Sequence, residues 1–178
     1  LPEKPVVIGH SMGGLIALLL CARGLARKGV LLTPAPPAGV FAIRPSNLMA
    51  FSRIQMKWRW WARPHRPTER EALRYTFNTM PEQEARPLYR DFVHESGRAL
   101  LEIALPWFDG RKAAAVRPED VTVPLLFVAG SADRLVPAGV VRRASRRFAS
   151  STYREYAGHG HWVLGQPGWQ AIAEETVA

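Results

Sequence analysis

Residues 9–14 read Gly-His-Ser-Met-Gly-Gly and lie between two apolar segments near the start of the chain. The preceding residues, 6–8, are β-branched and run into Gly9, which predicts a short buried strand of a parallel sheet. The following residues, 15–26, are apolar on nearly every side, which predicts a helix packed inside the fold. Gly29 is the expected C-cap of that helix. A strand, a tight turn and a buried helix in direct succession favour an α/β protein.

Strand and helix patterns continue to alternate beyond this motif. Apolar runs at 30–32 and 124–130 predict two more buried strands, and residues 152–156 predict a short fourth strand. Helices are expected at 140–148 and 167–177. Because strands that alternate with helices form parallel sheets covered on both faces, we expect an α/β fold with a parallel sheet of about four strands.

The middle of the chain, residues 35–118, has a different texture, in which tryptophan, arginine and proline replace the alternation. Helical patches are predicted near residues 48–61, 68–78, 81–95 and 97–103. Thr68 and Glu71 have the spacing of a capping box, which marks a helix start. We interpret this stretch as a mostly helical insertion between two parts of one core, residues 1–34 and 119–178.

Composition excludes several classes of protein. With 47% hydrophobic and 22% charged residues the chain is globular rather than disordered. Its longest apolar run, residues 15–22, is far shorter than the roughly 18 residues that span a bilayer. A single cysteine, Cys21, excludes an internal disulfide and is interpreted as inert packing. His65 and His94 have no partners at metal-ligand spacing, so we expect both on the surface and no metal site.

Ser11 occupies the centre of a Gly-x-Ser-x-Gly pattern at the predicted junction of strand and helix. Such a sharp turn lifts the serine out of the sheet, and flanking glycines let neighbouring backbone approach without a clash. The turn also aims the amide of Met12 and the helix N-terminus at the oxygen of a reacting carbonyl. Because a serine hydroxyl is a poor nucleophile by itself, this chemistry needs a base and an acid that orients the base.

Candidates for both groups follow in the order Ser, Asp, His. Asp133 lies three residues beyond the predicted strand end at Gly130, and His161 follows the predicted fourth strand. We therefore expect Ser11, Asp133 and His161 at the carboxyl ends of strands, where open α/β sheets place their sites.

With these motifs the sequence resembles the α/β-hydrolase family. The matching segments are Gly-His-Ser-Met-Gly-Gly at 9–14, Val-Pro-Leu-Leu-Phe-Val-Ala-Gly-Ser-Ala-Asp-Arg-Leu-Val-Pro at 123–137 and Gly-His-Trp at 160–162. The resemblance implies a nucleophile at Ser11, an acid at Asp133 and a base at His161, with no metal or organic cofactor. It also implies that residues 35–118 form the helical cap, or lid, through which such enzymes shape substrate entry.

The sequence departs from the family before residue 6, where the family has about four further strands. At roughly 30 residues per strand–helix–strand unit, on the order of 80–100 residues are absent, among them the second oxyanion-hole amide. We therefore expect the C-terminal portion of a longer hydrolase, with activity lowered by the truncation. A non-catalytic fragment, or a half-domain completed by an N-terminal partner or a second copy of the chain, is the alternative.

Other residues compete for the same roles. Asp109 is the rival acid, although it lies at the end of the presumed cap. His159 is the alternative base and also follows a glycine, but Gly-His before an aromatic and an aliphatic residue favours His161. His10 directly precedes the nucleophile, and we expect it to be packed rather than catalytic.

A basic and aromatic stretch at 57–66 permits two interpretations. Trp58 and Trp61, together with Trp162, are the expected substrate-binding residues of an apolar pocket, with the arginines facing water. Alternatively, this stretch and the arginine-rich residues 142–147 bind an anionic lipid or nucleic acid, in keeping with a net charge of +9. The arginines of 142–147 share one helix face, and we interpret them as a solvated surface.

These observations together predict a cytoplasmic serine hydrolase acting on a carboxylic ester or related small acyl compound through an acyl-enzyme intermediate. Amide, thioester, lactone and carbon–carbon bond hydrolysis use the same three groups, so the bond type stays open. No nucleic-acid partner and no transmembrane segment are expected.

Overall fold

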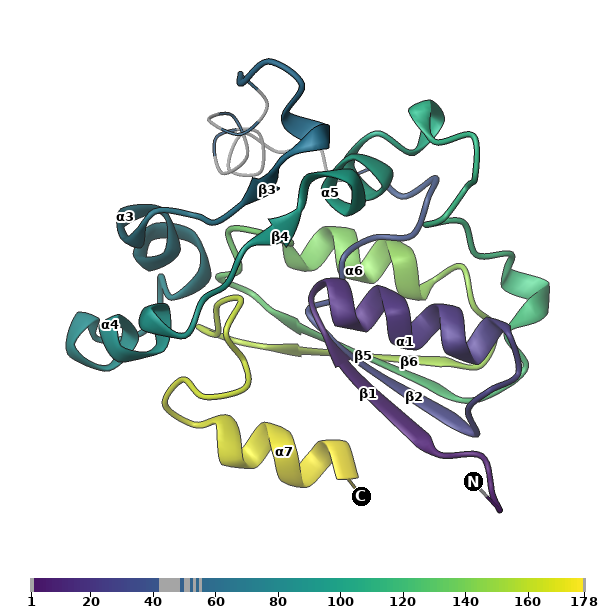
Figure 1. Cartoon of the computed structure of the whole chain (residues 1–178). Coiled ribbons are helices and arrows are strands. Elements are labelled where there is room, and N and C mark those ends of the chain that lie inside the picture. The colour runs from purple at the N-terminus through teal and green to yellow at the C-terminus, as the bar shows by residue number, and fades with distance from the viewer. Residues whose placement is uncertain (1, 42–48, 50–51, 53, 55, 178) are drawn as a thin grey trace.

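Four parallel strands form the sheet at the centre of the fold (Figure 1). A computed structural model of the chain describes residues 2–41, 49, 52, 54 and 56–177. The strands are β1 (Val6–His10), β2 (Lys28–Leu32), β5 (Leu125–Gly130) and β6 (Ser151–Tyr156), in the order β1-β2-β5-β6. Each neighbouring pair is parallel. The predicted α/β fold with a four-stranded parallel sheet is confirmed.

Helices cover both faces of this sheet, as Figure 1 shows. Helices α1 (Met12–Ala22) and α6 (Ala138–Ser145) lie on one face, and α7 (Trp169–Val177) lies on the other. Successive strand residues point to opposite faces, so Leu31 and Phe127 pack beneath α1 and α6 while Val30 and Val128 pack with Ile172 of α7. This two-sided burial explains the continuous apolar runs of β2 and β5.

Helix α1 ends earlier than the sequence predicted. It stops at Ala22, and Gly24 adopts the positive φ of 67° that turns the chain toward β2. The predicted C-cap at Gly29 is therefore wrong, because Gly29 lies inside β2. A Cβ there would come within 2.8 Å of Cys21 Sγ, so this glycine is needed for close packing of α1 on the sheet. Cys21 is buried, and burial raises the pKa of its thiol, which fits a packing role.

Short elements make up the segment between β2 and β5. They are η1 (Trp60–Ala62), β3 (Pro64–His65), α3 (Glu69–Glu71), the π-helix η2 (Ala72–Thr76), α4 (Glu82–Arg90), β4 (Glu95–Ser96), α5 (Gly97–Ala104), η3 (Pro106–Phe108) and η4 (Pro118–Asp120). The helices predicted near 68–78 and 81–95 are present in shorter form, and the helix predicted near 97–103 is α5. Of the helix predicted near 48–61, residues 48, 50, 51, 53 and 55 lie outside the described residues. Residues 56–59 form turns and a bend before η1, so the prediction of a helix up to residue 61 is wrong. The capping box at Thr68 is confirmed, because Thr68 and Glu71 each accept the other's backbone amide.

His65 is buried, which corrects its predicted surface position. His65 lies in β3, which pairs with β4 over two residues in antiparallel orientation. His65 is only 5% exposed, and its Nε2 bonds the carbonyl of Trp60 at 2.6 Å. His94 is exposed as expected.

Candidate active site

Ser11 stands on the turn between β1 and α1 in a strained backbone conformation. Its φ is 55° and its ψ −120°, a region that residues with a side chain rarely adopt. Two neighbouring segments hold the turn, because the Ser11 amide donates to Leu32 O at 2.9 Å and its carbonyl accepts from the Ala35 amide at 2.8 Å. The Ser11 hydroxyl makes no capping bond to α1. The surrounding strands therefore stabilise a turn that leaves this hydroxyl available for chemistry.

Close packing explains two glycines of the motif but not a third. A Cβ on Gly9 would lie 2.0 Å from the carbonyl oxygen of Gly13, and one on Gly14 would lie 2.7 Å from Pro34 Cβ. Both positions must therefore be glycine. A Cβ on Gly13 would meet no atom of the described residues within 4 Å, so crowding by them does not require glycine there.

Met12 begins α1 directly after the strained serine. The first amides of a helix have no partner inside the helix and carry the positive end of its dipole. The Met12 amide is one of these first amides and directly follows Ser11, and its role as one half of an oxyanion hole stays a prediction.

Asp133 and His161 are hydrogen-bonded in the interior. Asp133 Oδ2 contacts His161 Nδ1 at 2.8 Å. Its other oxygen, Oδ1, accepts the amides of Leu135 and Val136 at 2.7 and 2.8 Å, which fixes the carboxylate plane. Because an ionised carboxylate only accepts, His161 carries its proton on Nδ1 and leaves Nε2 free to take another.

The alternative acid and base have other partners. Asp109 accepts the Arg111 and Ala113 amides and pairs with Arg98. The hydrogen bond from the Ala113 amide is the main reason that the pKa of the Asp109 carboxyl is lowered. The His159 Nδ1 contacts Ala157 O at 3.0 Å, and its Nε2 is buried without a hydrogen-bond partner among the described residues. Asp133 is therefore hydrogen-bonded to His161, whereas the alternative acid, Asp109, and the alternative base, His159, bond other groups.

His10 packs directly against His161, as its predicted packing role requires. The two ring centres are 4.8 Å apart, and the Trp162 ring meets His10 edge-on at 5.5 Å. His10 Nε2 bonds the backbone carbonyl of His161 at 2.8 Å. Burial, and then the neighbouring His161, lowers the pKa of His10 to about 4. The His10 ring is therefore neutral at pH 7.

Four residues that bond the loops of Asp133 and His161 were not predicted from the sequence. Thr33 Oγ1 donates to the His161 carbonyl at 3.2 Å. Asn78 Nδ2 donates to Ala132 O at 3.0 Å, next to Asp133. Gln166 Oε1 accepts both Thr79 Oγ1 and the Gly160 amide at 2.9 Å, next to His161. A single threonine, asparagine or glutamine matches no motif, so only the folded chain shows that these residues support the site.

The three predicted substrate-binding tryptophans lie in different surroundings. Trp162 contacts His10 and also meets Phe77 edge-on at 5.3 Å. Trp58 is 81% exposed, and Trp61 is 40% exposed beside a shallow cavity of about 520 Å³ near β3 and α5. Only Trp162 contacts a neighbour of the candidate triad among the described contacts of these three rings.

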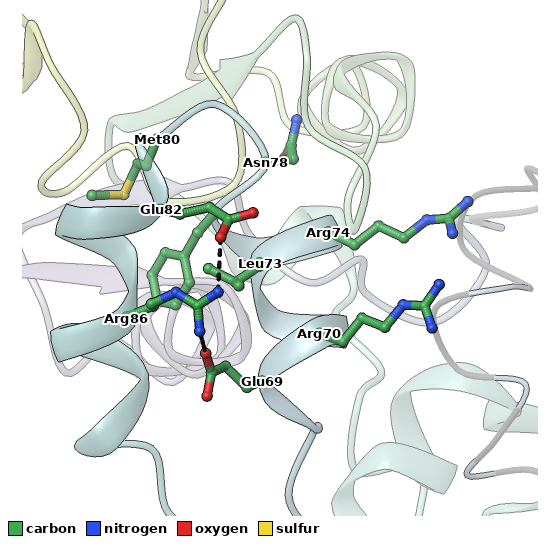
Figure 2. A pocket seen from close by; sticks show the side chains of 9 residues that line it. Glu69, Arg70, Leu73, Arg74, Asn78, Met80, Glu82 and Arg86 are labelled. Carbon is green, nitrogen blue, oxygen red and sulfur yellow. Dashed lines mark hydrogen bonds and ion pairs between the residues drawn. The ribbon is translucent and has the colours of Figure 1, made fainter.

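A cavity of about 620 Å³ lies between the π-helix and α4 (Figure 2). Its lining residues are Glu69, Arg70, Leu73, Arg74, Phe77, Asn78, Met80, Glu82 and Arg86. Arg86 joins Glu69 and Glu82 across it, while Arg70 and Arg74 point away together toward the other side. Neither Ser11, Asp133 nor His161 lines this cavity.

Two features are absent from the part of the chain that the structure describes. No group of three or more His, Cys, Asp or Glu side chains there is placed to hold a metal ion. No helix among the described residues is long and apolar enough to cross a membrane.

Comparison with known proteins identifies the family. A profile of the Alpha/beta hydrolase family matches residues 1–174, so this chain belongs to that family. A search of curated proteins found no match.

Solved structures with this fold include BpoC from Mycobacterium tuberculosis, with a TM-score of 0.69 and 16% identity over 98% of this chain. The monoacylglycerol lipase of Paleococcus ferrophilus (TM-score 0.60, 21% identity) and the esterase RhEst1 of Rhodococcus sp. (TM-score 0.63, 17% identity) match over 99% and 98% of this chain. The chain spans 65%, 69% and 64% of the length of these three proteins. At such identities the likeness shows the fold alone.

Proposed function

We propose that this chain carries the reacting groups of a serine hydrolase that cleaves carboxylic esters or related acyl compounds. The observation that carries the proposal is the buried hydrogen bond between Asp133 and His161 on loops at the same sheet edge as the strained turn at Ser11. Membership of the Alpha/beta hydrolase family and the likeness to a lipase and an esterase support the class of reaction.

In this proposal His161 Nε2 takes the hydroxyl proton of Ser11 as the serine oxygen attacks the carbonyl carbon. The Met12 amide stabilises the negative charge that develops on the carbonyl oxygen. His161 then returns the proton to the leaving group, and an acyl-enzyme remains on Ser11. Water, activated by His161, releases the acid, while Asp133 stabilises the imidazolium that forms in each half of the reaction.

We also propose that residues 35–118 act as the cap of this site. The turn after the π-helix supports this role, because Asn78 contacts the loop of Asp133 and Thr79 contacts the loop of His161 through Gln166. Phe77 packs against Trp162 on the same side. These apolar rings favour an acyl or aromatic group as the part of the substrate held near His161.

The anionic-surface alternative has less support. Arg142 pairs with Glu155, Arg143 donates to Phe41 O and Arg147 donates to Ala38 O. Three of the arginines on this face therefore already have partners within the chain, which lowers their value for binding phosphate.

Hydrolysis of p-nitrophenyl esters and labelling by a fluorophosphonate probe test the proposal. We expect both signals in the chain as it stands and neither in Ser11→Ala, while Ser150→Ala, a change at an exposed serine, keeps both. Folded protein without labelling would contradict the proposal for this chain and support a half-domain that needs a partner. Ester hydrolysis that survives Ser11→Ala would reject Ser11 as the nucleophile.

A further inference from the structure

We propose that His10 and Thr33 are positioning residues that clamp the backbone carbonyl of His161 and thereby set its imidazole relative to Ser11. This inference rests on the proposed role of His161 as the base. Neither residue touches the reacting atoms in this scheme, and both act through the backbone of His161.

The carbonyl of His161 accepts two side-chain donors, one from the last residue of β1 and one from the residue that directly follows β2. His10 Nε2 lies 2.8 Å from the oxygen and Thr33 Oγ1 lies 3.2 Å from it. The backbone amide of Val163, two residues further along the same loop, also donates to this oxygen at 3.0 Å. Of the three donors, only His10 and Thr33 tie the carbonyl to other parts of the fold. The backbone carbonyl of His161 is thus held by two side chains from outside its loop, and its ring is held by Asp133. With both ends held, the direction of Nε2 has little freedom left.

Thr33 is held in an unfavourable conformation while it makes this contact. It is fully buried, and its φ of 40° is rare for a β-branched residue. Its amide donates to Val128 O at 2.8 Å, which anchors the residue to β5. Backbone strain at a buried non-glycine residue persists only where the surroundings impose it, and such residues cluster at functional sites. We infer that the fold maintains this strained backbone because it places Thr33 Oγ1 within hydrogen-bonding distance of the His161 carbonyl.

His10 donates from a neutral ring. Because a carbonyl only accepts, Nε2 must carry the proton, and the lowered pKa of His10 keeps the ring uncharged beside His161. A neutral neighbour does not oppose the positive charge that His161 acquires during the proposed reaction. A protonated ring at the same distance would oppose it.

The clamp is built from the same segments that hold the serine turn. His10 directly precedes Ser11, and Thr33 lies between Leu32 and Ala35, the two residues whose backbones bond Ser11. The same backbone segments therefore fix the position of the proposed base relative to the proposed nucleophile. A displacement of about 1 Å between two such groups is enough to lower a rate about 100-fold.

Two variants remove one donor each, and each has a matched control. Thr33→Val and His10→Phe keep the shape but remove the hydrogen bond. Thr176→Val removes a threonine bond to the Ile172 carbonyl on α7, and His65→Phe removes a histidine bond to the Trp60 carbonyl. Thr33→Ser keeps the hydroxyl and serves as the rescue.

The first measurement is the proton NMR resonance of His161 Nδ1, which reports the Asp133 bond whether or not the chain is active. We expect a downfield resonance in the wild type and in Thr33→Ser, and a resonance broadened by solvent exchange in Thr33→Val and His10→Phe. The second is the rate of fluorophosphonate labelling at Ser11, expected to fall about ten-fold or more in the two clamp variants while the controls stay within two-fold. If Thr33→Val does not fold, His10→Phe decides by itself.

An unchanged resonance together with an unchanged labelling rate in His10→Phe or Thr33→Val would overturn the clamp. Wild-type protein that is never labelled would instead reject the proposed function, and the resonance would still decide whether the clamp holds His161. The two failures are therefore separable.

Discussion

Asp133 and His161 are 28 residues apart in the sequence and meet through a 2.8 Å hydrogen bond whose partners are almost wholly withdrawn from solvent. The Asp133 side chain is 0% exposed and the His161 side chain 3% exposed. Parallel pairing of β5 with β6 brings the loops after both strands to one edge of the sheet. A bond between an acid and an imidazole in such a place is costly to break, because either group alone would lack its partner in the interior.

Replacing Asp133 by asparagine should lower kcat for ester hydrolysis by about a thousand-fold or more, because the amide no longer holds the Nδ1 proton of His161. Steady-state kinetics with p-nitrophenyl esters measures this loss. Asp109→Asn is the informative comparison, since Asp109 bonds backbone amides instead of a histidine. It should reduce stability with kcat within a few-fold, and the opposite pattern would make Asp109 the acid.

The stability of the chain should depend on pH through His10. The pKa of His10 is about 4 in the fold and about 6.5 when unfolded, so the unfolded chain binds more protons between these values. Stability is therefore complete above pH 6.5 and falls as the pH drops toward 4, by up to about 3 kcal/mol from this group.

Urea unfolding at pH 5 and pH 7 measures the effect as a difference between wild type and His10→Gln, which cancels the titration of the carboxylates. The variant should lose less stability on acidification than the wild type. The matched control is His94→Gln, because His94 is exposed. An equal acid loss in wild type and His10→Gln would show that His10 is protonated in the fold.

Gln166 should be a larger contributor to stability than its sequence context suggests. Gln166→Met keeps the size of the side chain but removes the acceptor for the Gly160 amide and for Thr79. Because the Gly160 amide is buried, we expect a loss of about 1–3 kcal/mol in the free energy of unfolding. Gln170→Met, at an exposed position of α7, should change it by less than about 0.5 kcal/mol. Equal effects of the two changes would mean that water replaces the lost acceptor.

Two glycines of the serine motif should respond in opposite ways to alanine. Gly9→Ala places a methyl group 2.0 Å from a backbone oxygen, which side-chain movement cannot relieve, so we expect a loss of several kcal/mol or no soluble protein. Gly13→Ala meets open space inside α1 and should raise stability by about 0.5–1 kcal/mol. Thermal unfolding of both variants makes the comparison. A destabilised Gly13→Ala would contradict the open space found around this position.

The sequence pattern was sufficient to predict those features whose interactions lie within a few residues of one another. The junction at Ser11 could be predicted because a β-branched run, a glycine-rich turn and an apolar helix are consecutive in the chain. The capping box at Thr68 could be predicted for the same reason, since its two side chains bond amides three residues away. The pattern failed at Gly29, where glycine is explained by crowding from Cys21 and Leu125 rather than by a helix end.

The partners of the candidate site were decided by the tertiary structure. The sequence left His159 and His161 as rivals, and the pairing with Asp133 depends on how β5 and β6 align, which no local spacing encodes. Thr33 and Gln166 could not be predicted as supports of the site, because Thr33 bonds a residue 128 positions away and Gln166 bonds Thr79, 87 positions away. The predicted surface position of His65 was wrong, because the sequence did not indicate the two-residue strand in which this buried side chain lies.

The sequence by itself determined the class of fold and the order of the proposed reacting groups, since both follow from hydrophobic periodicity and turn chemistry within short windows. Only the folded chain decided which acid meets which histidine and which residues hold them in place. Those contacts join segments that are separated by many residues. Their hydrogen bonds contribute to stability because the folded interior excludes water from the bonded groups.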